Sequence, residues 1–154
     1  MCIHKRLDNL WLSMLSVRFL ARGHRNVLGT HRTTLEITTE DFLTESGTCI
    51  VGIRADQTLA NLPEQIKALA TSGSTSIVLR LTVEDSVEEI WGHGAPGLAY
   101  EDTTSMVVRT SSYECGRTLM VGADKAARDL DRSFVDLLQD NRTRILCDID
   151  YING

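Results

Sequence analysis

The sequence predicts a mainly-β fold with two helices, at the margin of the α+β class. Three observations lead to this prediction. Several short segments alternate apolar and polar residues, as strands with one buried face do. Two further segments space their apolar residues as a helix does. Finally, the second half of the chain resembles the first when the two are offset by 68 residues. We therefore expect two β-β-β-α-β units in one pseudo-twofold barrel or sandwich.

The offset of 68 residues brings similar residues together in the same order along both units. Ala55-Asp56 meets Ala123-Asp124, and the apolar alternation of 77–83 meets that of 145–151. With one inserted residue Gly23-His24 meets Gly92-His93, and with a second Thr33-Thr34 meets Thr103-Thr104. We predict repeats at about 17–83 and 87–151. A unit of this size has a poor core of its own, so both should share a single domain, 14–154.

The first unit should contain four strands and one helix. Alternation predicts strands at 17–22, 31–38, 48–54 and 75–83. Asp56 is expected to cap a helix through Leu69. Pro63 should interrupt this helix, and Asn61 and Glu64 have the spacing of a fresh capping box.

The second unit repeats this order after the short link Glu84–Ser86. Strands are expected at 87–91, 105–110, 117–122 and 143–151. Asp124 should cap a longer helix that carries apolar residues from Ala127 to Leu138. In both units, therefore, the Ala-Asp pair is interpreted as the turn from a strand into a helix.

Composition and charge exclude several classes of protein. The chain has 154 residues, of which 42% are hydrophobic and 24% charged, with only 2 prolines, so neither disorder nor a collagen-like structure is expected. No apolar run is long enough for a transmembrane helix, and we expect no membrane partner. The net charge of −5 argues against bulk nucleic-acid binding. This charge is uneven: residues 1–36 hold six basic and two acidic residues, and the remainder is acidic.

The cysteines and the N-terminal segment bear on the compartment. The 4 cysteines form no C-x-x-C pair, which favours a reducing cytoplasm. Residues 1–13 contain Asp8 and Asn9 where a signal peptide would be apolar, and no cleavage site follows. We therefore interpret 1–13 as an extension outside the fold, and we expect a cytoplasmic protein.

Short motifs in both halves resemble a known family. They are Arg22-Gly23-His24-x-Asn26-Val27, Thr33-Thr34-Leu35-Glu36-Ile37-Thr38, Cys49-Ile50-Val51-Gly52, Met106-Val107-Val108-Arg109 and Ala123-Asp124-Lys125-Ala126-Ala127. The chain is similar, over about residues 15–150, to the archaeal conserved domain-of-unknown-function family numbered three hundred and seventy-one. The resemblance implies an archaeal, cytosolic, mainly-β protein and assigns no activity to it, and the sequence leaves the cofactor unknown.

The candidate site lies at the two Gly-His pairs. His24 and His93 are the candidate catalytic residues, because imidazole titrates near neutral pH. Arginine binds carboxylates and phosphates in two-pronged contacts, so a pocket for a small anionic ligand is expected nearby. The candidate ligand-binding residues are Arg22, Asn26, His31, Arg32, Thr33 and Arg109.

Other functions are kept as alternatives. A metal site is not expected, because His31 and Glu36 would point to opposite faces of one strand. RNA binding is one alternative, although aromatic residues are only 5% of the chain and the net charge is unfavourable. The other is a protein-interaction module, either a monomer or a homodimer, that uses an exposed strand edge.

Overall fold

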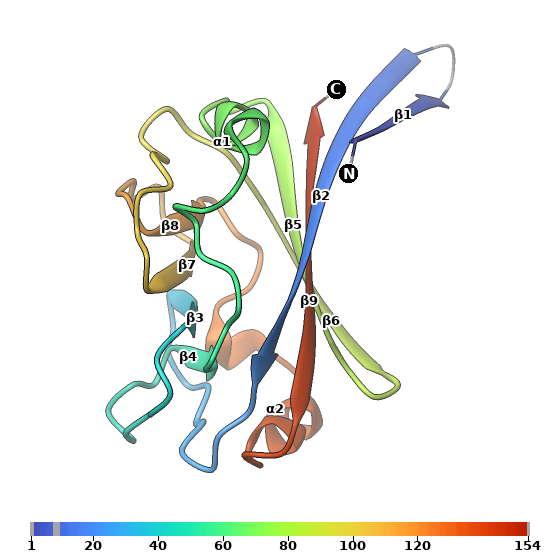
Figure 1. Ribbon diagram of the computed structural model, residues 1–154. Helices are drawn as coiled ribbons and strands as arrows, with labels where there is room; N and C mark the ends of the chain where they lie inside the picture. The colour runs from blue at the N-terminus through green and yellow to red at the C-terminus, as the bar shows by residue number, and fades with distance from the viewer. Residues whose placement is uncertain (1, 8–9, 154) are drawn as a thin grey trace.

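The computed structural model describes residues 2–7 and 10–153, which form two β-sheets with two short α-helices (Figure 1). The five-stranded sheet has the order β1-β2-β9-β5-β6, and the four-stranded sheet has the order β4-β3-β7-β8. The mainly-β fold with two helices is confirmed. Neither sheet closes into a barrel, so of the two architectures expected from the sequence the barrel is wrong.

The five-stranded sheet is antiparallel throughout. Its strands are β1 (Cys2–Leu7), β2 (Leu10–Arg22), β5 (Thr75–Val83), β6 (Ser86–His93) and β9 (Arg144–Asn153). The central strands β5 and β9 pair with each other from Thr75↔Asn153 to Thr82↔Leu146. Strand β2 starts at Leu10, seven residues before the alternation predicted it. Within the described part of the chain, residues 2–7 pair with 10–15 and with no other strand. This pairing does not test the expectation that 1–13 lie outside the fold, which stays a prediction.

The four-stranded sheet is built from shorter strands, β3 (Thr34–Thr38), β4 (Ile50–Gly52), β7 (Ser105–Arg109) and β8 (Thr118–Met120). Strand β3 begins three residues later than predicted. The reason is a turn at His31, whose ring Nδ1 accepts the amide hydrogens of Thr33 and Thr34. These two amides therefore bind a side chain and not the backbone of a neighbouring strand.

Both helices are shorter than predicted, α1 at Glu64–Ala70 and α2 at Arg132–Leu138. Asp56 and Asp124 do not cap them. Asp56 Oδ1 accepts the amide hydrogen of Leu20 at 2.8 Å, and Asp124 Oδ1 that of Trp91 at 2.9 Å. The two aspartates therefore bind free backbone groups at the edges of β2 and β6 instead. The predicted capping box is also wrong, because α1 begins after Pro63 with no side-chain cap.

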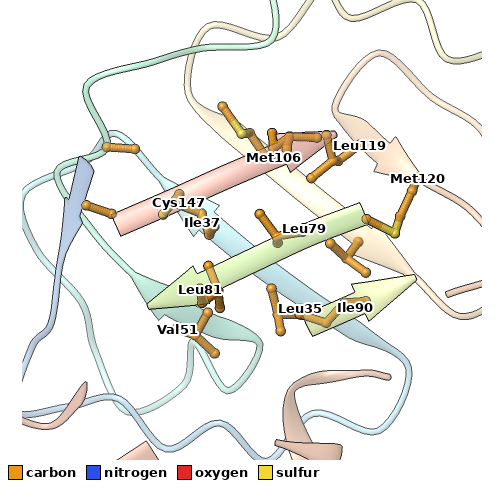
Figure 2. Packing of buried hydrophobic residues seen from close by; sticks show 14 of the residues in the cluster. Leu35, Ile37, Val51, Leu79, Leu81, Ile90, Met106, Leu119, Met120 and Cys147 are labelled. Carbon is orange, nitrogen blue, oxygen red and sulfur yellow. The ribbon is translucent and has the colours of Figure 1, made fainter. Parts of the chain in front are cut away.

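The hydrophobic core lies between the two sheets (Figure 2). It takes alternate residues from the inner face of each strand, such as Leu79 and Leu81 of β5 and Leu35 and Ile37 of β3. Each such side chain stabilises the fold by about 1.5–3 kcal/mol. The helices cover the open ends of the core with Ile66 and Phe134, among others. The opposite face of the five-stranded sheet carries polar residues such as Arg18 and Arg80.

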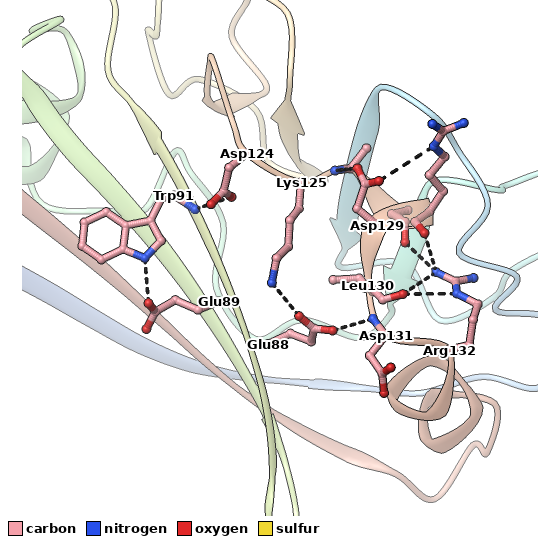
Figure 3. A network of polar contacts seen from close by, with 12 residues as sticks. Glu88, Glu89, Trp91, Asp124, Lys125, Asp129, Leu130, Asp131 and Arg132 are labelled. Carbon is pink, nitrogen blue, oxygen red and sulfur yellow. Dashed lines mark hydrogen bonds and ion pairs between the residues drawn. The ribbon is translucent and has the colours of Figure 1, made fainter.

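Polar contacts join β6 to the segment that leads into α2 (Figure 3). Glu88 is a buried carboxylate on the inner face of β6. It accepts hydrogen bonds from Lys125 Nζ at 2.8 Å and from the amide of Asp131 at 2.6 Å. Arg132 donates to four main-chain carbonyls of Gly29, Ala127, Arg128 and Leu130. These contacts hold the start of α2 against β6 and against the loop that contains Gly29.

Candidate functional site

A pocket of about 180 Å³ lies at the first Gly-His pair, where β2 ends. It is lined by Arg22, Gly23, His24, Asp41, Ile53, Arg54 and Asn141, and we call it the arginine pocket. Two of these residues, Arg22 and His24, were predicted from the sequence. The pocket therefore combines three segments of the chain, at 22–24, 41–54 and 141.

Close packing against α2 shapes the floor of the arginine pocket. The amide of His24 donates to Leu138 O at 2.9 Å, which brings the chain against the end of α2. A Cβ on Gly23 would lie 2.6 Å from Asp140 O and closer still to Leu138 O. Only glycine fits at this position, which explains the glycine of the first Gly-His pair.

Backbone pairing places the two arginines side by side. Arg22 and Ile53 form an isolated bridge, with both amide-to-carbonyl bonds at 2.7–2.8 Å. Arg54 follows directly, and its amide donates to Glu40 O at 2.8 Å. Both guanidinium groups line the pocket, and neither has a hydrogen bond or ion pair with another described residue. Two unneutralised positive charges therefore lie next to the same small volume.

Arg54 has an unfavourable backbone conformation, with φ at +54°. A side chain in this left-handed region costs about 1–2 kcal/mol. The residue at the matching place in the second half is Gly122, with φ at +59°. Glycine adopts this conformation without the penalty. An arginine here therefore costs stability, and such strain is typical of functional positions.

His24 presents a hydrogen-bond donor. Its Nδ1 accepts the amide hydrogen of Asn26 at 3.0 Å, so the neutral ring carries its proton on Nε2. Asn26 itself is committed to the fold, because its Nδ2 donates to Leu43 O at 2.7 Å. Asn141 holds the loop from the other side by accepting the amide hydrogen of Arg25. The loop is thus ordered by its own contacts.

The pocket also contains one carboxylate, that of Asp41, which makes no ion pair with either arginine. The carboxylate of the neighbouring Asp140 forms an ion pair with Arg142, with 3.0 Å between Oδ2 and Nη2, and this contact lowers the pKa of Asp140 below its ordinary value. The lining residues thus carry two guanidinium groups and an imidazole against one carboxylate. The arrangement favours an anion.

His93 does not share this pocket. Arg22 pairs with Arg144 at one end of β9, whereas His93 pairs with Ser76, which pairs with Ile152 at the other end. Eight residues of strand separate the two places, or about 26 Å. His93 Nδ1 contacts Gly94 O at 2.8 Å, and its Nε2 would lie 2.6 Å from a Cβ on Gly122. The two Gly-His pairs are therefore separate places on the molecule.

The two halves nevertheless make matching backbone contacts. Gly23 donates to Thr143 O as Gly94 donates to Thr75 O, and the bridge Arg22↔Ile53 matches His93↔Val121. These contacts make Gly94 the counterpart of Gly23 and His93 the counterpart of Arg22. The counterpart of His24 is therefore Ala95. The predicted equivalence of the two Gly-His pairs is therefore wrong by two residues, and the duplication itself stays a prediction.

The remaining predicted residues gather around the junction of β3 and β7. Thr34, next to Thr33, is the pairing partner of Arg109, and Thr33 O accepts the amide hydrogen of Thr110. Arg109 Nε donates to Thr118 Oγ1 at 2.8 Å, and the guanidinium lies 4.7 Å from the centre of the Tyr113 ring. Arg32 is exposed. His31, Arg32, Thr33 and Arg109 thus lie outside the residues that line the arginine pocket.

Sequence reasoning missed Asp41, Arg54 and Asn141. A signal for Arg54 exists: the offset of 68 residues aligns Ile53-Arg54-Ala55-Asp56 with Val121-Gly122-Ala123-Asp124. An arginine in place of a glycine between matching neighbours is unusual. Asp41 and Asn141 lie in loops whose course depends on tertiary packing, and no local pattern marks them.

Arg109 also affects a cysteine. Burial raises the pKa of Cys115, but hydrogen bonds with Thr118 at 3.4 Å and Arg109 at 3.5 Å outweigh it and lower this pKa below its ordinary value. Burial and the nearby Glu36 raise the pKa of Cys49 to about 11. Among the described residues no cluster of three or more His, Cys, Asp or Glu could hold a metal ion.

The fold and the pocket define a two-sheet, mainly-β protein with a small cationic pocket at a strand end. Over residues 2–7 and 10–153, no helix has the length and apolar character needed to cross a membrane. The chain belongs to the family described as domain of unknown function DUF371, which matches residues 19–151. It is also 42% identical over 125 residues to an uncharacterised protein of Methanocaldococcus jannaschii. That alignment covers 81% of this chain and 92% of the archaeal protein.

Proposed function

We propose that the chain binds a small anionic ligand in the arginine pocket. The observation that carries this proposal is Arg54, which has a strained backbone and lies beside Arg22. Neither guanidinium group has a partner among the described residues. Paired arginines bind the two oxygens of a carboxylate or phosphate. The Nε2–H of His24 adds a third donor.

The size of the pocket limits the ligand. About 180 Å³ equals the volume of roughly six water molecules in the liquid. Inorganic phosphate or a short carboxylic acid fits this volume, whereas most of a nucleotide would extend out of it into solvent. Asp41 can accept a hydrogen bond from a hydroxyl group of such an acid.

Binding has more support than turnover. The residues that line the arginine pocket include no serine, threonine, cysteine or lysine, so the carboxylate of Asp41 and the ring of His24 are the groups there of a nucleophilic type. The neutral ring of His24 already holds its proton on the nitrogen that is not bonded to Asn26, so it donates rather than accepts. The donor on His24 and the make-up of the lining both suit a pocket that holds an anion.

Calorimetric titration with inorganic phosphate and a panel of two- to four-carbon acids tests the proposal. We expect Arg22→Gln to weaken binding about 10- to 100-fold, since a charge-assisted hydrogen bond contributes about 1.5–3 kcal/mol. Arg117→Gln is the matched control, because this exposed arginine lies outside the pocket and also lacks a described partner. Undetectable binding by the wild type, or an equal loss in both variants, would refute it.

The proposal includes a cytoplasmic location, supported by the free thiols of Cys49, Cys115 and Cys147. RNA binding finds less support, because the exposed aromatic residues are dispersed. Phe42 precedes β4, Trp91 lies on β6 and Tyr113 lies beneath Arg109. Stacking of successive bases needs aromatic residues that are neighbours in space.

A further inference from the structure

The five-stranded sheet has one face that no other described element covers. Both helices and the four-stranded sheet lie on its opposite side (Figure 1). On this outer face, a row of charges with alternating sign crosses four strands, in the order Arg18 (β2), Asp148 (β9), Arg80 (β5) and Glu89 (β6). Arg18 contacts Asp148 at 2.8 Å, and Arg80 contacts Glu89 at 3.2 Å.

Rows with apolar members lie on both sides of the charged row. On one side the residues are Leu20, Leu146, Thr82 and Val87, and on the other they are Ser16, Asp150, Val78 and Trp91. Three of these large apolar side chains are well exposed: Leu20 at 37%, Trp91 at 45% and Val87 at 54%. Figure 3 shows Trp91 and Glu89 on the face of β6 away from Glu88 and Lys125. Such exposure suits a surface that a partner covers.

We infer that this face is a homodimer interface, with a twofold axis that runs parallel to the strands between β9 and β5. Such an axis places β2 opposite β6 of the second copy, and β9 opposite β5. Arg18 then faces Glu89 of the second copy, and Asp148 faces Arg80 of the second copy. Every charge of the row meets one of opposite sign.

The charge pattern also selects this orientation over the alternative. An axis across the strands, along the charged row, would place Arg18 opposite Arg18 and Asp148 opposite Asp148. Like charges at such contacts oppose association. With the axis parallel to the strands, Leu20 instead faces Val87 of the second copy, so apolar groups also meet.

The size of the face is adequate for a modest interface. Four strands spaced about 4.8 Å apart and about 30 Å long present roughly 600 Å² in flat projection. A stable complex buries about 800 Å² on each partner, and side chains add relief to the flat projection. Two sheets stacked with strands nearly aligned are a common packing arrangement.

Sedimentation equilibrium of the full chain over a range of concentrations tests the inference. We expect the wild type to form dimers and Arg18→Glu to weaken dimerisation about tenfold or more, because like charges replace opposite ones at two symmetric contacts. Arg117→Glu, which makes the same change of charge at an exposed residue just before β8 of the other sheet, should dimerise as the wild type does.

The double variant Arg18→Glu/Glu89→Arg separates contacts between copies from contacts within the chain. It breaks the pairs with Asp148 and Arg80 inside each chain, but position 18 again faces the opposite charge at position 89 of the second copy. We expect dimerisation to return toward the wild-type value. A monomeric wild type at all concentrations, or a double variant weaker than Arg18→Glu, would overturn the inference.

Discussion

Replacing Arg54 by glycine should make the protein more stable and at the same time remove its anion site. The left-handed backbone at φ +54° costs an arginine about 1–2 kcal/mol. Glycine avoids this cost but loses about 0.5–1 kcal/mol more backbone entropy on folding. The midpoints of these two ranges differ by about 0.75 kcal/mol, which is the expected net gain in the free energy of unfolding.

For a chain of this length the gain corresponds to a melting temperature about 1–4 °C higher. Calorimetry without ligand measures this rise, and titration with inorganic phosphate measures the loss of affinity. Glu84→Gly is a matched control, because Glu84 has the same φ of +54° in the turn between β5 and β6 and does not line the arginine pocket. It should gain similar stability and keep phosphate affinity.

The two readouts refute different steps. If Arg54→Gly lowers the melting temperature while Glu84→Gly raises it, Arg54 makes stabilising contacts and its strain does not indicate function. If Arg54→Gly binds phosphate as tightly as the wild type, the pocket does not use this guanidinium and the proposed site is wrong.

Three further perturbations test the chemistry and the packing. In a Cys2→Ser background, iodoacetamide should modify Cys115 faster than Cys49 at pH 7.5, because the pKa of Cys115 is lowered and that of Cys49 is raised to about 11. Peptide mass spectrometry measures the two rates, and faster modification of Cys49 would contradict this reasoning. Tyr100→Phe should lower the free energy of unfolding in urea by about 1–3 kcal/mol and Tyr151→Phe by less, because of the two hydroxyls it is that of Tyr100 that donates to a buried main-chain carbonyl. An equal loss in both variants would contradict this. Glu88→Ala should lower the free energy of unfolding by about 2–3 kcal/mol, because it leaves the ammonium group of Lys125 and the amide of Asp131 without their acceptor. A loss under about 0.5 kcal/mol by the same measurement would show that water replaces the carboxylate.

The strands were predicted well where local pattern and tertiary contacts agree. Strand β5 occupies 75–83 as predicted, because the apolar residues Ile77, Leu79, Leu81 and Val83 recur at every second position, as on the buried face of a strand. Strand β3 is shorter than its pattern suggests, because the ring of His31 binds amides that the strand would have used. Such a side-chain contact competes with sheet pairing, and periodicity does not reveal it.

The aspartates of the two Ala-Asp pairs illustrate the same limit. A carboxylate ahead of an apolar segment is a sound helix-capping signal from local sequence. Asp56 and Asp124 bind the amides of Leu20 and Trp91 instead, residues 36 and 33 positions away in the chain. Only the fold brings these strand edges close enough to compete with the helix.

The sequence by itself determined the strand and helix content, the family and two residues of the arginine pocket, because alternation, short motifs and the Gly-His pair at 23–24 are local. The tertiary structure decided which distant residues join them. It placed Arg54, Asp41 and Asn141 at Arg22, and it separated His93 by the length of a strand. The physical reason is that strand pairing fixes positions in space through backbone hydrogen bonds between distant segments, and these bonds leave no local pattern in the residues that they bring together.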